Sequence, residues 1–131
     1  MIRRPPRSTQ GVSSAASDVY KRQLVTSSVA LSSTNRTTIY TVPSNHRSIV
    51  RQIIAGNVDA SNPATLKLEF YDASSTTHFA LTGATSIAAN GYLWLNDILI
   101  GLEAGDIISA TAGAADDLTV TTVVEQIVIG G

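Results

Sequence analysis

Hydrophobic and polar residues alternate with a period of two along most of the chain from residue 24 onward. The segment 64–72 is the clearest case, because Leu66, Leu68 and Phe70 alternate with polar or amphipathic residues. Turn-forming residues separate such segments about every ten residues, the spacing typical of a β-sandwich or barrel. No segment has the sustained apolar spacing of an amphipathic helix.

This pattern predicts an all-β fold of about eight strands, an antiparallel β-sandwich of jelly-roll-like form, without fixing the strand order. The segment 92–100 has the strand pattern but is expected to break at Asn96-Asp97. The dipeptide Asn90-Gly91, just before it, is a strong β-hairpin signal. The expected strands cover residues 24–32, 37–43, 47–58, 64–72, 78–83, 92–100, 107–113 and 118–129.

Two segments raise specific expectations about which side chains share a face. In 37–43, Ile39 is expected on the opposite face from Tyr40. In 47–58, strict alternation places Ile49, Arg51 and Ile53 on one face and the intervening residues on the other. A charged side chain among apolar ones needs a counter-charge or solvent, so Arg51 is expected to reach a carboxylate or water.

The first 23 residues differ from the rest of the chain in charge. They carry five basic residues and one acidic residue, whereas residues 24–131 carry four basic and nine acidic residues. Arg3-Arg4 is the pair found in twin-arginine export signals, but the apolar segment that should follow is absent. The other functional interpretation is a basic arm that binds nucleic acid. The string "SDVYKRQ" and most of residues 2–23 resemble the conceptual translation of a sequencing-library adapter. We therefore expect residues 1–23 to be a non-native or disordered segment and residues 24–131 to form a single domain.

Composition excludes several classes of function. The chain has no cysteine, which rules out disulfides and thiolate metal sites. An acidic body repels phosphate backbones, so no direct nucleic-acid partner is expected. No apolar stretch approaches the roughly 20 residues that a membrane-spanning helix needs.

Residues able to carry chemistry are few and scattered. His46 and His78 form no metal-binding motif and are expected to be exposed loop residues. Asp116-Asp117 supplies too few oxygens for a calcium loop, and Glu103 with Asp106 is better explained as a pair of turn-flanking acids than as an acid/base pair. No nucleophile elbow or phosphate-binding glycine loop is present. We expect no enzyme, no catalytic residue, no bound metal and no cofactor.

Tyr92 and Trp94 are the one pair of residues that suggests a binding surface. Two positions apart in a strand, they lie on the same face, with Leu93 and Leu95 on the other. An exposed aromatic pair would suit a carbohydrate-binding module, because sugar faces stack on aromatic rings. The structural alternative, which we favour, is that both rings pack in the core or in a subunit contact.

Two long segments are similar to a group of small virion structural proteins of tailed bacteriophages from marine and other environmental genomes. The first reads "TTIYTVPSNHRSIVRQIIAGNVDASNPATLKLEFYDAS" from residue 37, and the second reads "GLEAGDIISATAGAADDLTVTTVVEQIVI" from residue 101. The resemblance spans nearly all of residues 24–131 but rests on turns and strand patterns. It implies a β-sandwich on the phage particle, as a head decoration, neck or tail component, and it carries no catalytic residues.

The sequence therefore predicts a non-enzymatic virion structural protein that binds other virion subunits, among them capsid, neck or tail proteins. We expect a homo-oligomer, with a trimer as a guess from the role, and assembly into the virion in the bacterial host cytoplasm. The alternative function is a carbohydrate-binding β-sandwich module that uses Tyr92 and Trp94.

Overall fold

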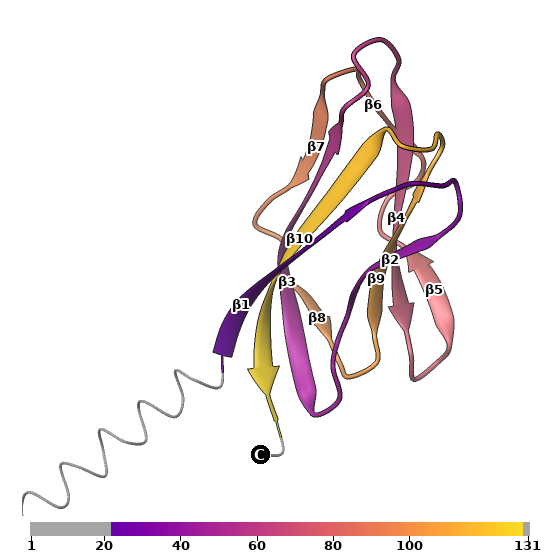
Figure 1. Cartoon of the computed structure of the whole chain (residues 1–131). Helices are drawn as coiled ribbons and strands as arrows, with labels where there is room; N and C mark the ends of the chain where they lie inside the picture. Colours follow the sequence, from indigo (N-terminus) through magenta and orange to yellow (C-terminus); the bar gives the residue numbers. More distant parts are fainter. Residues whose placement is uncertain (1–21, 130–131) are drawn as a thin grey trace, which may run out of the picture.

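The computed structural model describes residues 22–129, which form ten strands and no helix, in two antiparallel five-stranded sheets (Figure 1). Sheet A contains β1 (Arg22–Ala30), β10 (Leu118–Val128), β3 (His46–Asn57), β7 (Tyr92–Leu95) and β8 (Ile100–Leu102). Sheet B contains β2 (Thr37–Thr41), β9 (Ile107–Ala112), β4 (Ala64–Asp72), β5 (Thr77–Ala80) and β6 (Thr85–Ile87). The predicted all-β sandwich is confirmed.

The strand order is that of a jelly roll. Sheet A runs β1-β10-β3, with β7 and β8 pairing with successive parts of the far edge of β3. Sheet B runs β2-β9-β4, with β5 and β6 sharing the far edge of β4 in the same way. If each shared edge is counted as one interrupted strand, four strands face four, which is the eight-stranded arrangement of a jelly roll. The break expected at Asn96-Asp97 lies between β7 and β8.

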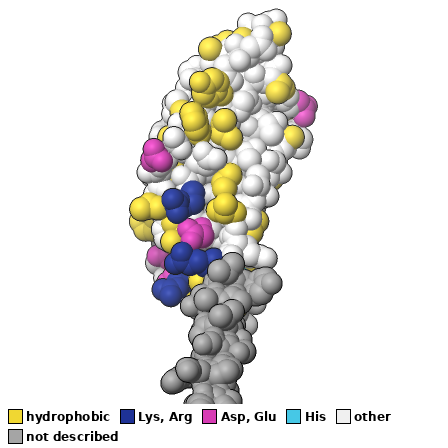
Figure 2. Space-filling view, turned by 90° about the vertical axis from the view of Figure 1, so that its left-hand side faces the viewer, with side chains coloured by type: hydrophobic (Ala, Val, Ile, Leu, Met, Phe, Trp, Pro, Cys, Tyr) yellow, Lys and Arg dark blue, Asp and Glu magenta, His cyan; other side chains and the backbone are white. Residues whose placement is uncertain are grey.

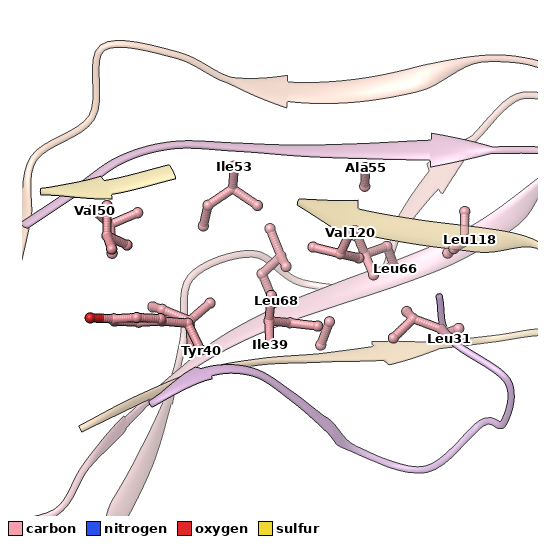
Figure 3. Close-up of a cluster of buried hydrophobic side chains, with 14 of the residues drawn as sticks. Leu31, Ile39, Tyr40, Val50, Ile53, Ala55, Leu66, Leu68, Leu118 and Val120 are labelled. Atoms are coloured by element: carbon pink, nitrogen blue, oxygen red, sulfur yellow. The ribbon is translucent and has the colours of Figure 1, made fainter. Parts of the chain in front are cut away.

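The core lies between the two sheets (Figure 3). Leu66 and Leu68 of β4 are fully buried, as are Val120 and Val124 of β10. Leu31, just after β1, is buried with them. These side chains are removed from water on the inner faces of both sheets, so hydrophobic burial holds the two layers together.

A β-bulge at Arg51 changes which residues of β3 face the core. The register of β3 against β10 shifts by one residue, because Val123 opposes Gln52 while Val124 opposes Val50. Val50 and Ile53 are consequently both buried, and Ile54 lies on the outer face. The expectation that Ile49, Arg51 and Ile53 share one face is therefore wrong, since it assumed alternation without a bulge.

A second irregularity affects β2. Its register against β9 shifts between Thr38 and Tyr40, and Ile39 and Tyr40 are both buried. The expectation that they occupy opposite faces is wrong for the same reason as in β3. The phenol of Tyr40 donates to Gln126 Oε1 at 2.7 Å and accepts from the hydroxyl of Ser48 at 2.6 Å. Burial raises the pKa of Tyr40, which keeps this phenol protonated.

The turn at Asn90-Gly91 is present but does not close a β-hairpin. Asn90 has a φ of 59°, and Gly91 donates its amide hydrogen to the carbonyl of Ala88 at 2.8 Å. The flanking strands β6 and β7 belong to different sheets, so the turn carries the chain from one layer to the other. The predicted foreign segment 1–23 lies outside the described residues except for Arg22 and Gln23, which begin β1.

Candidate functional site

The outer face of sheet A carries the aromatic pair. Tyr92 is 68% exposed and Trp94 is 51% exposed, while Leu93 and Leu95 turn inward and pack against the core. The alternation predicted for this strand is confirmed, and packing of the two rings in the core is excluded. In Figure 2, hydrophobic side chains gather over one half of this face, and charged side chains gather over the other half.

Strand pairing determines the neighbours of the two rings. Trp94 lies opposite Ile54 of β3, and its indole Nε1 donates to Gln52 Oε1 at 3.0 Å. Tyr92 lies opposite Gly56, where an added Cβ would meet no atom within 4 Å. We call Tyr92, Trp94, Ile54, Gln52 and Gly56 the aromatic platform. Its aromatic residues stand on the edge strand β7, and its floor is β3.

Uncharged side chains continue the platform across the sheet. Ile54 pairs with Thr121 of β10, which in turn pairs with Ser28 of β1, and the two hydroxyls are 2.7 Å apart. Gly56 pairs with Thr119. All of these side chains are neutral, so the rows that cross the platform carry no charge.

The charges on this face gather around the β3 bulge, where Arg51 is next to the platform residue Gln52. Arg51 Nη1 is 3.0 Å from Glu125 Oε2, and Arg22 Nη1 is 3.1 Å from Glu125 Oε1. The expectation that Arg51 meets a carboxylate is confirmed. Both arginines are largely exposed, so these ion pairs contribute little to stability.

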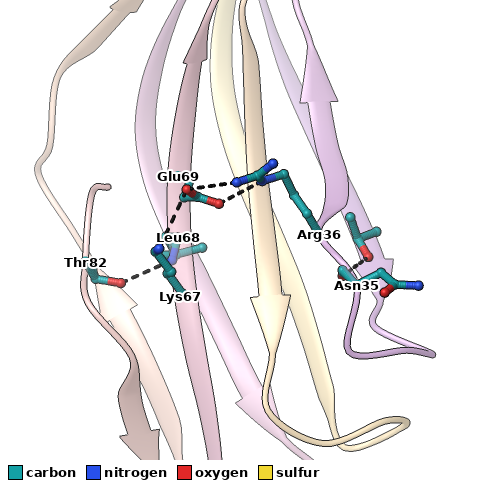
Figure 4. A network of polar contacts seen from close by, with 7 residues as sticks. Asn35, Arg36, Lys67, Leu68, Glu69 and Thr82 are labelled. Atoms are coloured by element: carbon teal, nitrogen blue, oxygen red, sulfur yellow. Dashed lines mark hydrogen bonds and ion pairs between the residues drawn. The ribbon is translucent and has the colours of Figure 1, made fainter. Parts of the chain in front are cut away.

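The outer face of sheet B is occupied by a polar network (Figure 4). Glu69 is only 5% exposed, and its two oxygens accept from Arg36 Nε at 2.8 Å and Arg36 Nη2 at 3.3 Å. Lys67 Nζ lies 3.8 Å from Glu69 Oε2. The hydrogen bond from Arg36 is the main reason that the pKa of Glu69 lies below the usual range of a glutamate. The carboxylate is therefore ionised and internally satisfied at neutral pH.

Neither histidine is the exposed loop residue that the sequence predicts. His46 begins β3 and its Nδ1 lies 2.8 Å from the carbonyl oxygen of Ser44. His78 belongs to β5 and is half-buried, with its ring centroid 4.6 Å from that of Tyr71 on the paired strand. The turn residues around each histidine suggested loops, although the strand expected over 78–83 already begins at His78, which pairs with Tyr71 of β4.

A cleft of about 630 Å³ opens between the sheets where β3 and β8 lie near the end of β4. Asp106 lines it, but its two oxygens accept from the amides of Ala73 at 3.0 Å and Glu103 at 2.8 Å. Both oxygens of Asp106 thus stabilise turns, which agrees with the turn-flanking interpretation of this residue. Asp72 is used in the same way, since hydrogen bonds from Ser74 lower its pKa.

Within residues 22–129 no group of three or more acidic or histidine side chains is placed to hold a metal ion. Asp116 adopts a φ of 67° in the turn before β10, consistent with a role in the turn. None of the described residues belongs to a helix long and apolar enough to cross a membrane.

Sequence reasoning identified Tyr92 and Trp94 but missed Gln52, Ile54 and Gly56. Gln52 and Ile54 were missed because of the bulge, since unbroken alternation assigns both residues to the face of Val50. A glycine inside an otherwise apolar strand was the available signal for the third, since such a position often marks open space or a close approach.

No family model and no curated protein matches the sequence. Solved structures match in fold. A structure of the Bacillus endospore appendages, a family of disulfide-linked pili, is 12% identical with a TM-score of 0.50, over 83% of this chain and 88% of that chain. The acid-stable capsid of Helicobacter pylori bacteriophage KHP30 is 12% identical with a TM-score of 0.50, over 81% of this chain and 87% of that chain. The Drosophila NLP core, studied for pentamer formation and histone binding, is 12% identical with a TM-score of 0.51, over 80% of this chain and 98% of that chain. These likenesses show a shared fold.

Proposed function

We propose that this chain is a non-enzymatic structural subunit of a tailed-bacteriophage particle, a head decoration or a head, neck or tail component that binds other virion subunits. The main support for this proposal is the jelly-roll strand order, in which β1-β10-β3 faces β2-β9-β4, an architecture common in viral shells. The fold likeness to a phage capsid and to a pilus protein supports a structural role. The place of action is the virion, after assembly in the host cytoplasm.

The free edge of β1 supports assembly through strand pairing. Among the described strands, β1 pairs only with β10, in an unbroken register of nine residues. The amide of Leu31 donates to the carbonyl of its partner Leu118, so alternate residues back along β1 are bonded to β10. The amides of Thr26 and Leu24 fall at the intervening positions and point away from β10.

This edge also lacks the features that usually prevent pairing between molecules. Beyond Arg22, β1 contains no charged residue, and it contains neither proline nor a bulge. The hydroxyl of Ser27 donates to the carbonyl of Ile39 at 2.6 Å, which ties the later part of β1 to sheet B. The residues before Ser27 are the part of the edge to which a strand of a neighbouring subunit can add. We propose a second copy as that neighbour, in a homo-oligomer for which a trimer is the specific expectation.

Sedimentation of the full chain over a range of concentrations tests the proposal. Thr26→Pro removes an amide that faces the free edge and not the β10 ladder, so the subunit should still fold. Thr26→Val keeps the amide and serves as the matched control. We expect an oligomer for the natural chain and for Thr26→Val, and a monomer for Thr26→Pro.

A chain that stays monomeric at every concentration, or an oligomer that Thr26→Pro leaves intact, would exclude assembly through this edge. The particle assignment has a separate test in the genomic neighbourhood of the coding sequence. Adjacent portal, major capsid or tail genes are expected, and a neighbourhood of unrelated metabolic genes would contradict the virion role.

A further inference from the structure

We infer that the aromatic platform on sheet A is a binding site for neutral carbohydrate, with Tyr92 and Trp94 as the stacking surface. This inference does not depend on the virion role, because it concerns a different surface from the β1 edge. It is carried by the exposure of the two rings, the hydrogen bond that holds one of them, and the open, uncharged floor beside them.

The two aromatic residues are arranged for stacking. Tyr92 and Trp94 lie on the same face of β7, roughly 7 Å apart along the strand, as residues two apart in any strand do. The bond from Trp94 Nε1 to Gln52 Oε1 links the ring diagonally to the neighbouring strand β3. Because that bond restrains the indole, less rotational freedom is lost when a ligand binds.

The floor beside the rings leaves room for a ligand. Gly56 opposes Tyr92 and presents no side chain, with open space where a Cβ would stand. The next residue across the sheet is Thr119, and the hydroxyls of Ser28 and Thr121 border the adjacent row. The side-chain carbonyl of Gln52 accepts the hydrogen bond from Trp94, and the side-chain NH₂ group of Gln52 remains as a donor. Hydroxyl and amide groups around a stacking surface match a ligand with C–H faces and hydroxyl edges.

Charge and size favour a sugar over a second copy of the chain. The platform rows hold no charged side chain, which suits a neutral ligand better than an acidic or basic one. Within the paired rows its apolar part consists of Tyr92, Trp94 and Ile54, and hydroxyl-bearing residues follow directly across the sheet. One further exposed apolar residue, Val58, follows the end of β3. A stable protein interface buries about 800 Å² and some 20 to 30 residues on each partner, which this small group of apolar side chains does not supply.

Trp94 is the only tryptophan in the chain, so intrinsic fluorescence reports on this site directly. The full chain is titrated with maltoheptaose, cellohexaose, chitohexaose and laminarihexaose, and is also applied to an array of neutral bacterial glycans. We expect a saturable change in tryptophan emission with at least one glycan class. On the array, Tyr92→Ala and Trp94→Ala should each weaken binding about tenfold, and the double variant should abolish it.

Two further variants isolate the platform geometry. Gly56→Val fills the open floor, and its Cβ meets no atom within 4 Å, so it should block binding in a folded subunit. Phe79→Ala removes another exposed aromatic residue, on the edge of sheet B, and should leave binding unchanged. Circular dichroism and sedimentation are recorded for every variant.

The absence of any glycan response on the array and in fluorescence would overturn the inference. So would glycan binding that survives in the Tyr92→Ala/Trp94→Ala variant. A shift of the double variant from oligomer to monomer, without glycan binding by the natural chain, would assign the platform to contact between copies. Loss of glycan binding in that variant with unchanged sedimentation is the result we expect.

Discussion

The outer faces of the two sheets differ in how far their side chains are paired with one another or left exposed to solvent. On sheet B, the one carboxylate near the middle, Glu69, is almost buried and both its oxygens are bonded to Arg36. On sheet A, the residues of the aromatic platform leave two large rings in solvent. A carboxylate that is bonded internally has little to offer a partner, although His78 Nδ1 and Ser109 Oγ on the same face are buried without a hydrogen-bond partner among the described residues. Exposed aromatic rings, in contrast, gain from being covered. Sheet A is therefore the face on which we place recognition, and sheet B is the face on which we place internal stabilisation.

The largest effect is expected from a change that damages the core common to both faces. Leu68 lies on the inner side of β4, directly between Lys67 and Glu69 on the outer side. Leu68→Ala should cost about 2–5 kcal/mol of unfolding free energy, because it leaves a cavity in a fully buried position. Urea denaturation measures it, and Leu68→Met, which nearly conserves volume, should cost less than about 1.5 kcal/mol. A midpoint unchanged by Leu68→Ala would contradict the packing of the core.

A smaller effect is expected when the network on sheet B is opened. Arg36→Gln removes both charged hydrogen bonds to Glu69 and leaves only Lys67, at 3.8 Å, as a cation beside it. The urea midpoint at neutral pH should fall by less than in Leu68→Ala and by more than in Trp94→Ala. Arg47→Gln, a change at an exposed arginine on sheet A, is the matched control and should have little effect. Equal midpoints for the two glutamine variants would show that the network contributes nothing to stability.

The same network should make part of the stability depend on pH. Arg36 holds the pKa of Glu69 below its value in the unfolded chain, so this contribution is fully present above the unfolded pKa. It is lost as the pH falls through the lowered pKa of the folded state. The difference in urea midpoint between the natural chain and Arg36→Gln should therefore shrink between about pH 5 and pH 3. A difference that stays constant over this range would mean that Glu69 is not the group responsible.

The smallest effect on stability is expected on the aromatic platform. Tyr92→Ala should change the unfolding free energy by about 0.5 kcal/mol or less, because that ring is already largely in water. Trp94→Ala, at a half-exposed ring that packs beside Ile54, should cost about 1 kcal/mol or less. Thermal unfolding followed by far-ultraviolet circular dichroism measures this without the tryptophan signal. A loss as large as that of Leu68→Ala would show that the rings contribute to packing and would weaken the case for a binding surface.

The parts of the fold that the sequence predicted are those governed by local pattern. The strand 64–72 alternates without interruption and agrees with β4 to the residue, and the alternation of β7 is also as predicted. The bulges at Arg51 and near Ile39 were not predictable, because nothing in the local pattern marks an extra residue and its position depends on the partner strand. Only part of the platform could be predicted from the sequence, for the same reason. Its rings are neighbours in sequence, whereas Gln52 and Gly56 approach them only through the pairing of β3 with β7.

The bulge in β3 has a further consequence for how chains of this fold can vary in length. Deleting one residue at Arg51 would remove the bulge and leave Val50 and Ile53 facing the core, with the rest of the strand in phase. Deleting one residue from the straight strand β10 opposite would instead exchange inner and outer side chains along part of the strand. An alignment of relatives should therefore show single-residue gaps at position 51. It should show none within β10, although loops on either side are free to grow or shrink.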